Sequence, residues 1–230
     1  MAHERFFYTQ HIDNDILFFE DDEHFHLSRV LRKKSGDTVW AIDGKGSTFE
    51  TRIELIDKNK SSARIIRRYP AFGEPRNRIS LAAGVIKSAH WDILLEKAVE
   101  LGVYAIFPLN THYTVKSGIK RERSEKIILS AVKQCGRSRI PELHPVTDFS
   151  EFIRRNRGNS VFICDNQDDH PLLEPDDNTS DHLVLIGPEG GFHPDEIRLA
   201  LDAGAKPVLL ANRRLRTETA CMLALSRLVI

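Results

Sequence analysis

Apolar and polar residues alternate in two different ways along this chain. From Phe49 to Leu55 every second residue is apolar or threonine and the residues between them are charged, a period of two that predicts a half-buried antiparallel strand. Residues 38–42 and 62–66 are expected to be neighbouring strands because they are rich in β-branched and apolar residues. The beginning of the chain therefore predicts a small β-barrel.

One helix is expected before these strands. Asp22 is suited to cap a helix that runs through Phe25, Val30 and Leu31. Residues spaced three and four apart share one face of a helix. The opposite side is therefore expected to carry three basic residues, Arg29, Arg32 and Lys33.

The pattern changes at residues 69–75, which contain two prolines and a glycine. Beyond this stretch apolar segments and helical patterns alternate. Strands are expected at residues 79–86, 103–107, 161–164, 183–186 and 207–210, and helices after Ser88, at 122–135 and at 149–155. The first of these helices is expected to bury Trp91, Leu94, Leu95 and Ala98 and to end at Gly102. Such alternation implies a parallel sheet covered on both faces, so we expect two domains, 1–72 and 73–230.

Composition limits the possible functions. The 230 residues are 41% hydrophobic and 29% charged, which is ordinary for a soluble globular protein, and the net charge of zero argues against a purely electrostatic nucleic-acid binder. The charges are segregated, however: residues 116–139 contain eight Lys or Arg, whereas 165–181, an expected surface loop, contain seven acids and no Lys or Arg. A basic face on a neutral protein is therefore possible, although solvated helix surfaces would give the same pattern.

The cysteines and the chain's apolar runs predict a cytoplasmic protein. Three distant cysteines without a C-x-x-C pair indicate a reducing compartment and no zinc site. No run approaches the roughly 18 apolar residues that span a bilayer, and the N-terminus lacks the apolar core of a signal peptide. We expect no metal and no membrane partner, and we interpret His24 and His26 as surface or interdomain residues.

Several common signatures are missing. The segment 44–48 lacks the spacing of a phosphate-binding loop, no G-x-G-x-x-G follows the first strand of the second region, and no G-x-S-x-G is present. These absences argue against a dinucleotide-binding or hydrolase fold.

Two other segments carry the chemistry. The loops 187–191 and 211–216 each follow an apolar strand and precede a helix, and such turns at the carboxyl ends of parallel strands bind ligands. Gly190 and Gly191 permit positive φ and close backbone approach, while Arg213 and Arg216 are suited to anions. The plainer alternatives are an ordinary glycine-rich turn and a surface cluster beside a first-turn acid, Glu218.

These loops also carry a resemblance. Residues 185–192, LIGPEGGF, and 215–220, LRTETA, look like motifs of the ribosomal RNA small subunit methyltransferase E family, which belongs to the SPOUT class. Segments at 26–37, 97–103 and 134–137 match further blocks of that family in the same order. The resemblance implies a PUA-like barrel for RNA, a trefoil-knotted domain for S-adenosylmethionine, a homodimer, and N3-methylation of a uridine in 16S ribosomal RNA.

The resemblance also implies roles for individual residues. The cofactor pocket would be lined by Leu185, Ile186, Gly187, Pro188, Glu189, Gly190, Gly191, Leu209, Leu210, Ala211, Asn212, Arg213, Arg214, Leu215 and Arg216. For the chemistry of this reaction, our candidates to stabilise the negative charge that uridine develops on losing its N3 proton are Arg137 and Arg216. Glu189 or Glu218 could accept that proton, and structural capping is the equally good alternative for these carboxylates. RNA phosphates would be held by Arg29, Arg32, Lys33 and the basic run that includes Arg137.

The chain departs from the family pattern at several positions. Ala211 replaces the usual Gly, Arg214 an aliphatic residue, His193 a Ser, Tyr113-Thr114 the common Arg-Ser pair, and Lys133 a common Glu. Alanine fits a left-handed backbone poorly, so the second loop is expected to differ slightly, and His193 is a weaker helix cap than Ser. Two alternatives remain open: a SPOUT methyltransferase for another RNA site, and a ribosome-binding factor without catalysis.

Overall fold

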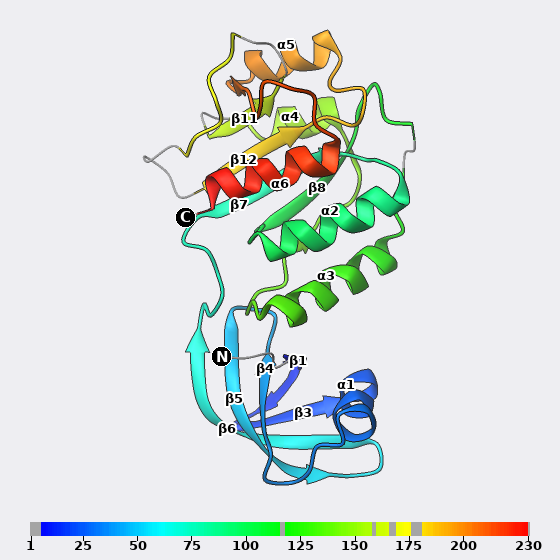
Figure 1. The fold of residues 1–230 in the computed structure, drawn as a ribbon, viewed down its shortest axis with the longest axis vertical. Coiled ribbons are helices and arrows are strands. Elements are labelled where there is room, and N and C mark those ends of the chain that lie inside the picture. The colour runs from blue at the N-terminus through cyan, green and yellow to red at the C-terminus, as the bar shows by residue number, and fades with distance from the viewer. Residues whose placement is uncertain (1–5, 116–117, 158–159, 166–168, 176–180, 230) are drawn as a thin grey trace. The chain divides into compact units, whose positions relative to one another are not determined.

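The computed structural model describes residues 6–115, 118–157, 160–165, 169–175 and 181–229. These residues form two compact units (Figure 1). The first contains the chain up to Glu74 together with Leu129–Ile140, and the second contains Pro75–Ile128 and the chain from Pro141 onward. Each unit is described by itself.

The first unit is a curved six-stranded sheet in the order β1-β4-β5-β6-β3-β2. Its strands are β1 Phe7–Tyr8, β2 His11–Asp13, β3 Ile16–Glu20, β4 Thr38–Ile42, β5 Ser47–Ile56 and β6 Lys60–Pro70. The edge strands β1 and β2 are consecutive in the chain, and Thr9 between them bridges the two ends of the sheet. Its amide donates to the Ile42 carbonyl at 3.0 Å and its hydroxyl to the Phe18 carbonyl at 2.7 Å. This bridge supports the predicted barrel.

Alternation along β5 is confirmed for most of its length. Phe49, Thr51 and Ile53 are buried in the barrel, but Leu55 is 53% exposed, so the prediction is wrong there. The pairing of β5 with β6 shifts register between Ile53 and Leu55, and an inserted residue reverses which side of the strand faces the core.

The helix of the first unit differs most from its prediction. It consists of one α-helical turn, α1 Asp21–Phe25, capped by Glu20 rather than Asp22, and a π-helical turn, η1 His26–Val30. The wider π turn changes the phase of the side chains, which explains why Leu27 is fully buried while Phe25, Val30 and Leu31 are exposed.

Two related predictions are also wrong. The helix ends at Val30 and Arg32 has a φ of 51°, so Arg29, Arg32 and Lys33 do not share a helical face. His24, which was expected at the surface or between the domains, is buried within the first unit, and its Nδ1 lies 2.8 Å from the Ser61 hydroxyl oxygen.

The second unit contains a seven-stranded sheet whose recorded pairings are all parallel, which confirms the prediction from β–α alternation. The order is β10-β8-β7-β12-β11-β13, with β9 beside β8. The strands are β7 Arg78–Gly84, β8 Ala105–Asn110, β9 Glu142–Leu143, β10 Thr147–Asp148, β11 Val161–Cys164, β12 Asp181–Ile186 and β13 Lys206–Val208. β8 lies further along the chain than expected, and β13 ends before residue 210.

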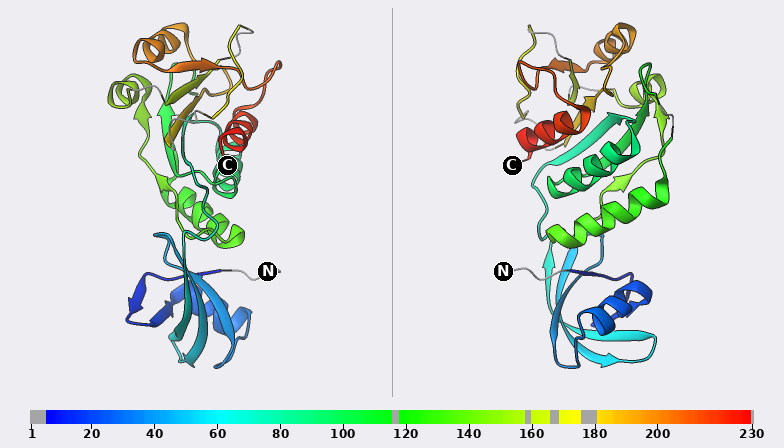
Figure 2. Two further views of the ribbon diagram at one scale, coloured as in Figure 1. Left: turned by 90° about the vertical axis from the view of Figure 1, so that its left-hand side faces the viewer. Right: turned by 45° about the vertical axis from the view of Figure 1, so that its right-hand side comes forward.

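Helices cover both faces of this sheet (Figure 2). They are α2 Ser88–Glu100, α4 Phe149–Arg155, α5 Pro194–Asp202 and α6 Thr217–Leu228, whereas a further helix, α3 Arg121–Cys135, belongs to the first unit from Leu129 onward. α2 packs with α6 on one face, and α4 packs with α5 on the other. The four apolar residues predicted for α2 are buried, and Gly102, with a φ of 86°, follows its end. Ser88 is the first helical residue, and Lys87 is the cap.

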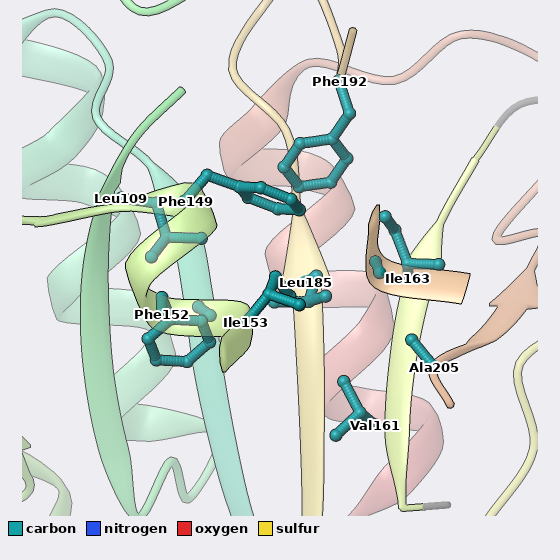
Figure 3. Packing of buried hydrophobic residues seen from close by; sticks show 11 residues of the cluster. Leu109, Phe149, Phe152, Ile153, Val161, Ile163, Leu185, Phe192 and Ala205 are labelled. Atoms are coloured by element: carbon teal, nitrogen blue, oxygen red, sulfur yellow. The ribbon is translucent and has the colours of Figure 1, made fainter. Parts of the chain in front are cut away.

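The core beneath α4 and α5 fixes the end of β12 (Figure 3). Leu185 from the strand lies among Phe149, Ile153 and Ile163, which come from α4 and β11. Phe192, just beyond the strand, packs on Phe149 with ring centroids 5.1 Å apart. The segment between Leu185 and Phe192 is therefore anchored at both ends by buried side chains.

Candidate functional site

Both predicted loops lie at the carboxyl edge of the parallel sheet. The first, Gly187–Gly191, follows β12 in the middle of the sheet, and the second, Ala211–Arg216, follows β13 at its edge. The structure brings the two loops together, because the hydroxyl of Thr217 donates a hydrogen bond to the carbonyl of Gly187 at 3.1 Å. The sequence predicted that the two loops share a pocket, and this contact places the start of α6, directly after the second loop, against the first loop.

The first loop is a tight turn that depends on the absence of side chains. A Cβ on Gly187 would lie 2.7 Å from the backbone carbon of Gly191, closer than real Cβ atoms approach. Gly191 has a φ of 75°, its amide donates to the Pro188 carbonyl at 2.8 Å, and a Cβ there would meet no atom within 4 Å. Gly191 therefore combines a left-handed backbone with open space beside it.

Gly190 is required for a different reason from the one expected. Its φ lies outside the left-handed range, and a Cβ there would lie 2.8 Å from the Cβ of Tyr113. The close approach at Gly190 is therefore made by a side chain from the turn after β8.

A carboxylate holds the first loop against that same turn. Glu196 in α5 accepts the amide of His193 at 2.9 Å through one oxygen and the amide of His112 at 2.9 Å through the other. His193 is the N-cap of α5, and its ring nitrogen accepts from the Asp195 amide at 3.3 Å, a weak bond. Sequence reasoning missed Glu196, although an acid three residues after an N-cap is the signature of a capping box.

The second loop is exposed and rich in arginine. Leu209 and Leu210 are buried at its base, whereas Arg213, Arg214 and Arg216 are exposed. Ala211 does not have a positive φ, so alanine occupies this position without a left-handed backbone. Arg216 is the N-cap of α6 and makes no side-chain capping bond.

The two candidate proton acceptors are placed differently. Glu218 is 9% exposed in the first turn of α6, and its carboxylate oxygen lies 3.0 Å from Nδ1 of His90 on α2. Glu189 is exposed in the first loop. Glu218 is thus held by a partner beside the helix N-terminus that favours its charge, and Glu189 is the accessible carboxylate.

Arg137 lies in the first unit and is 3% exposed. Its guanidinium donates to the carboxylate of Glu74 at 2.7 Å, and the same carboxylate accepts the Arg139 amide at 2.8 Å. A buried ion pair of this kind favours a structural role, in contrast to the catalytic and RNA-binding roles expected for Arg137.

Ion pairs also reduce the expected basic surface around α3. Arg121 pairs with Glu125, Arg123 with Asp92 and Lys133 with Glu23. Residues 116 and 117 of this run lie outside the described residues, as do parts of the acidic stretch 165–181.

Neither a metal cluster nor a membrane helix is found in the described part of the chain. No three His, Cys, Asp or Glu side chains there come together as metal ligands. No helix in the same residues is long and apolar enough to cross a membrane.

Comparison with known proteins identifies the class and then the family. Residues 73–229 match the RNA methyltransferase domain, and residues 19–66 match the RNA methyltransferase PUA domain. Ribosomal RNA small subunit methyltransferase E of a Synechocystis species is 30% identical over 211 residues, which are 88% of this chain and 69% of that protein. The chain belongs to the ribosomal RNA small subunit methyltransferase E family.

Solved structures agree with this assignment. The Neisseria gonorrhoeae ribosomal RNA small subunit methyltransferase E bound to S-adenosyl methionine is 28% identical, has a TM-score of 0.88, and covers 97% of this chain and 95% of its own. A probable rRNA-methyltransferase from Porphyromonas gingivalis is 33% identical with a TM-score of 0.83, covering 96% and 95% of the two chains.

Proposed function

We propose that this protein is an S-adenosylmethionine-dependent methyltransferase that forms N3-methyluridine in the 16S ribosomal RNA of the small subunit. The observation that carries the proposal is the hydrogen bond from Thr217 to Gly187, which joins the two loops of the family's motifs at the carboxyl edge of the sheet. Family membership supplies the reaction class, and the N3 position is the finer part of the proposal.

The residues of the two loops fit this cofactor. Buried Leu185, Ile186, Leu209 and Leu210 give an apolar base, and open space adjoins the backbone at Gly191. A ligand with an apolar body and a few polar groups suits an apolar site edged by backbone amides. The segments Leu185–Gly191 and Leu209–Arg216 would hold it.

When bound, S-adenosylmethionine supplies a methyl group that is activated by its sulfonium sulfur. The protein must place N3 of the uridine in line with that group and stabilise the charge that N3 shares with its carbonyl oxygens once its proton leaves. Arg216 is exposed at the second loop and is suited to stabilise that charge, and Glu189 is the accessible acceptor for the proton. The pairing of Arg137 with Glu74 makes Arg137 the weaker candidate.

RNA binding completes the proposal. N3 lies on the Watson–Crick edge, so the uridine must be unpaired or flipped out of a helix. Residues 1–72 would act as the PUA-like RNA-binding domain, with phosphates held by Arg29, Arg32 and Lys33, and residues 73–230 as the knotted catalytic domain. A homodimer in the cytoplasm is part of the same proposal.

The test uses small subunits from cells that lack this enzyme. The purified protein should transfer labelled methyl groups to their 16S RNA, and mass mapping should find N3-methyluridine. Calorimetry should show S-adenosylmethionine binding to the protein alone. Another methylated nucleoside would favour a different RNA site, and absence of both binding and transfer would leave a non-catalytic ribosome-binding factor.

Arg216 provides the residue-level test. Arg216→Ala should lower kcat by about 100-fold or more if its charge stabilises the transition state, because single electrostatic groups of this kind contribute that much. Arg216→Lys keeps the charge and should recover part of the rate. An unchanged kcat in Arg216→Ala at saturating RNA would show that the charge is stabilised elsewhere.

A further inference from the structure

Three aromatic rings gather beside the first loop, outside the segments proposed for the cofactor. His112 and Tyr113 come from the turn after β8, and His193 caps α5. The His112 and His193 centroids are 4.4 Å apart, those of His112 and Tyr113 4.8 Å, and those of Tyr113 and His193 6.0 Å. Two of the rings stand where the family pattern has Ser and Arg, so the cluster belongs to this chain.

The rings are mounted rigidly. The turn is closed by the Thr114 amide, which donates to the Thr111 carbonyl at 3.0 Å, and by the Thr114 hydroxyl, which accepts the Thr111 amide at 2.9 Å. Glu196 ties this turn to His193 through two backbone amides. Side chains held in this way lose little conformational entropy when a ligand stacks on them.

The rings also remain accessible. Tyr113 is 42% exposed, His112 is exposed, and the His193 side chain keeps 33% of its surface. His112 and His193 line a hollow of about 560 Å³, a volume within the range of ligand sites. Its other walls include Asn110, Asp148, Asp195 and Glu196.

The charged side chains around the hollow favour binding of some parts of an RNA over others. Three carboxylates on the wall would repel phosphates. Glu196 already accepts two backbone amides and Asp148 the side-chain amide of Asn110, but the Asp195 carboxylate is 75% exposed and can accept hydrogen bonds from the N–H groups of base edges. Unpaired bases in RNA commonly stack on Tyr and His rings. The combination suits a nucleobase and disfavours the sugar–phosphate backbone.

We propose that His112, Tyr113 and His193 form a stacking platform for an unpaired nucleobase that flanks the target uridine. The inference rests on the proposed function. A base that receives the methyl group must approach the cofactor to about 3–3.5 Å. Because Tyr113 itself covers the backbone at Gly190, a base on this ring is separated from that part of the loop, which assigns the platform to a neighbour of the target.

The first test measures methyl transfer to small subunits from cells that lack the enzyme. Tyr113→Leu keeps bulk but removes the ring, and His193→Asn keeps a capping side chain but removes the ring. Each should raise KM for the RNA substrate about tenfold with little change in kcat, because stacking acts equally in the ground and transition states. Tyr113→Phe should restore KM, and Leu201→Ala, at an exposed position of α5, should not alter it.

Two further readouts separate the platform from other roles. The slope of log KM against log salt should stay constant in Tyr113→Leu, whereas loss of a phosphate contact would reduce it by about one unit. The affinity for S-adenosylmethionine, measured by calorimetry, should also stay constant. An unchanged KM, a reduced salt slope or a parallel loss of cofactor affinity would each overturn the platform.

Fluorescence reports stacking directly. Tyr113→Trp should show quenching when small subunits are added, beyond the response of the wild-type protein with Trp40 and Trp91 alone. Equal responses would contradict stacking at this position. If the wild-type enzyme is active and the variants have its KM for RNA, the stacking platform alone is refuted. If the wild-type protein neither binds the cofactor nor transfers methyl groups, the proposed function is refuted.

Discussion

The two loops at the carboxyl edge of the sheet are built in opposite ways. Gly187–Gly191 is fixed by its backbone, with glycines packed on each other and Phe192 buried directly behind it. Ala211–Arg216 has no glycine, no positive φ and a row of exposed arginines. The first loop shapes a surface by lacking side chains, whereas the second presents charge.

This contrast explains why substitutions are expected to act unequally. A side chain added at Gly187 must displace backbone, which a packed structure resists. A side chain changed in the second loop mostly meets solvent. The comparison therefore predicts that substitutions in the first loop have much larger effects than substitutions in the second, although the hydrogen bond from Thr217 to Gly187 places the two close together.

The largest effect is expected for the rates at which two thiols, Cys135 and Cys221, react with a labelling reagent. Their ratio reports whether α6, which directly follows the second loop, stays closed in the native protein. Cys221 is buried on this helix, and burial raises the pKa of its thiol, which keeps it in the unreactive protonated form as pH rises. A thiol reagent should label the exposed Cys135 at least about 1000-fold faster than Cys221 in native protein, since Cys221 reacts only after opening.

Mass spectrometry of peptides measures the two rates separately, and it also separates both from the third thiol, Cys164. Raising the pH should accelerate Cys135 without exposing Cys221. Labelling of the two thiols at similar rates would mean that α6 opens readily and that the second loop has no fixed anchor.

The next largest effect is expected for Gly187→Ala. Its Cβ would lie 2.7 Å from the Gly191 backbone, and overpacking of this kind costs about 1–3 kcal/mol. Affinity for S-adenosylmethionine should fall about tenfold or more in calorimetry, because the loop must shift. Pro188 and Gly191 stay unchanged in this variant, so normal cofactor affinity would disprove the pocket assignment.

Thr217→Val removes the hydrogen bond between the loops while it keeps the shape of the side chain. The free energy of unfolding should fall by about 1 kcal/mol in urea denaturation, as for a typical buried hydrogen bond, and more if the Gly187 carbonyl is left without a partner. Thr217→Ser keeps the hydroxyl and serves as the matched control. Equal stability of the two variants would show that the loops are held together by other contacts.

The smallest effect is expected for Ala211→Gly, which restores the residue common in the family. Because Ala211 does not have a left-handed backbone, glycine relieves no strain and should lower stability by only about 0.4–1 kcal/mol through the unfolded chain. Thermal denaturation measures the change. A gain in stability would indicate that the backbone at this position is strained after all.

The amino-acid sequence was enough to predict the elements whose side chains repeat regularly over several turns. The buried face of α2, the bounds of α3 and α4 and the parallel sheet follow from periodicity, because long apolar repeats can be buried in only one way. It also located both loops, since strand–loop–helix order places them at one edge of the sheet.

Features that depend on short or irregular segments could be recognised only in the folded protein. Strands of two or three residues, such as β1, β2 and β9, have no period to detect, and the π turn at His26–Val30, in which Leu27 is buried and Val30 exposed, departs from the regular helix that was predicted. The pairing of Arg137 with Glu74 and the bridge of Glu196 between His112 and His193 join residues distant in the chain. Such partners are chosen by packing, which acts after local preferences have been satisfied and can override them.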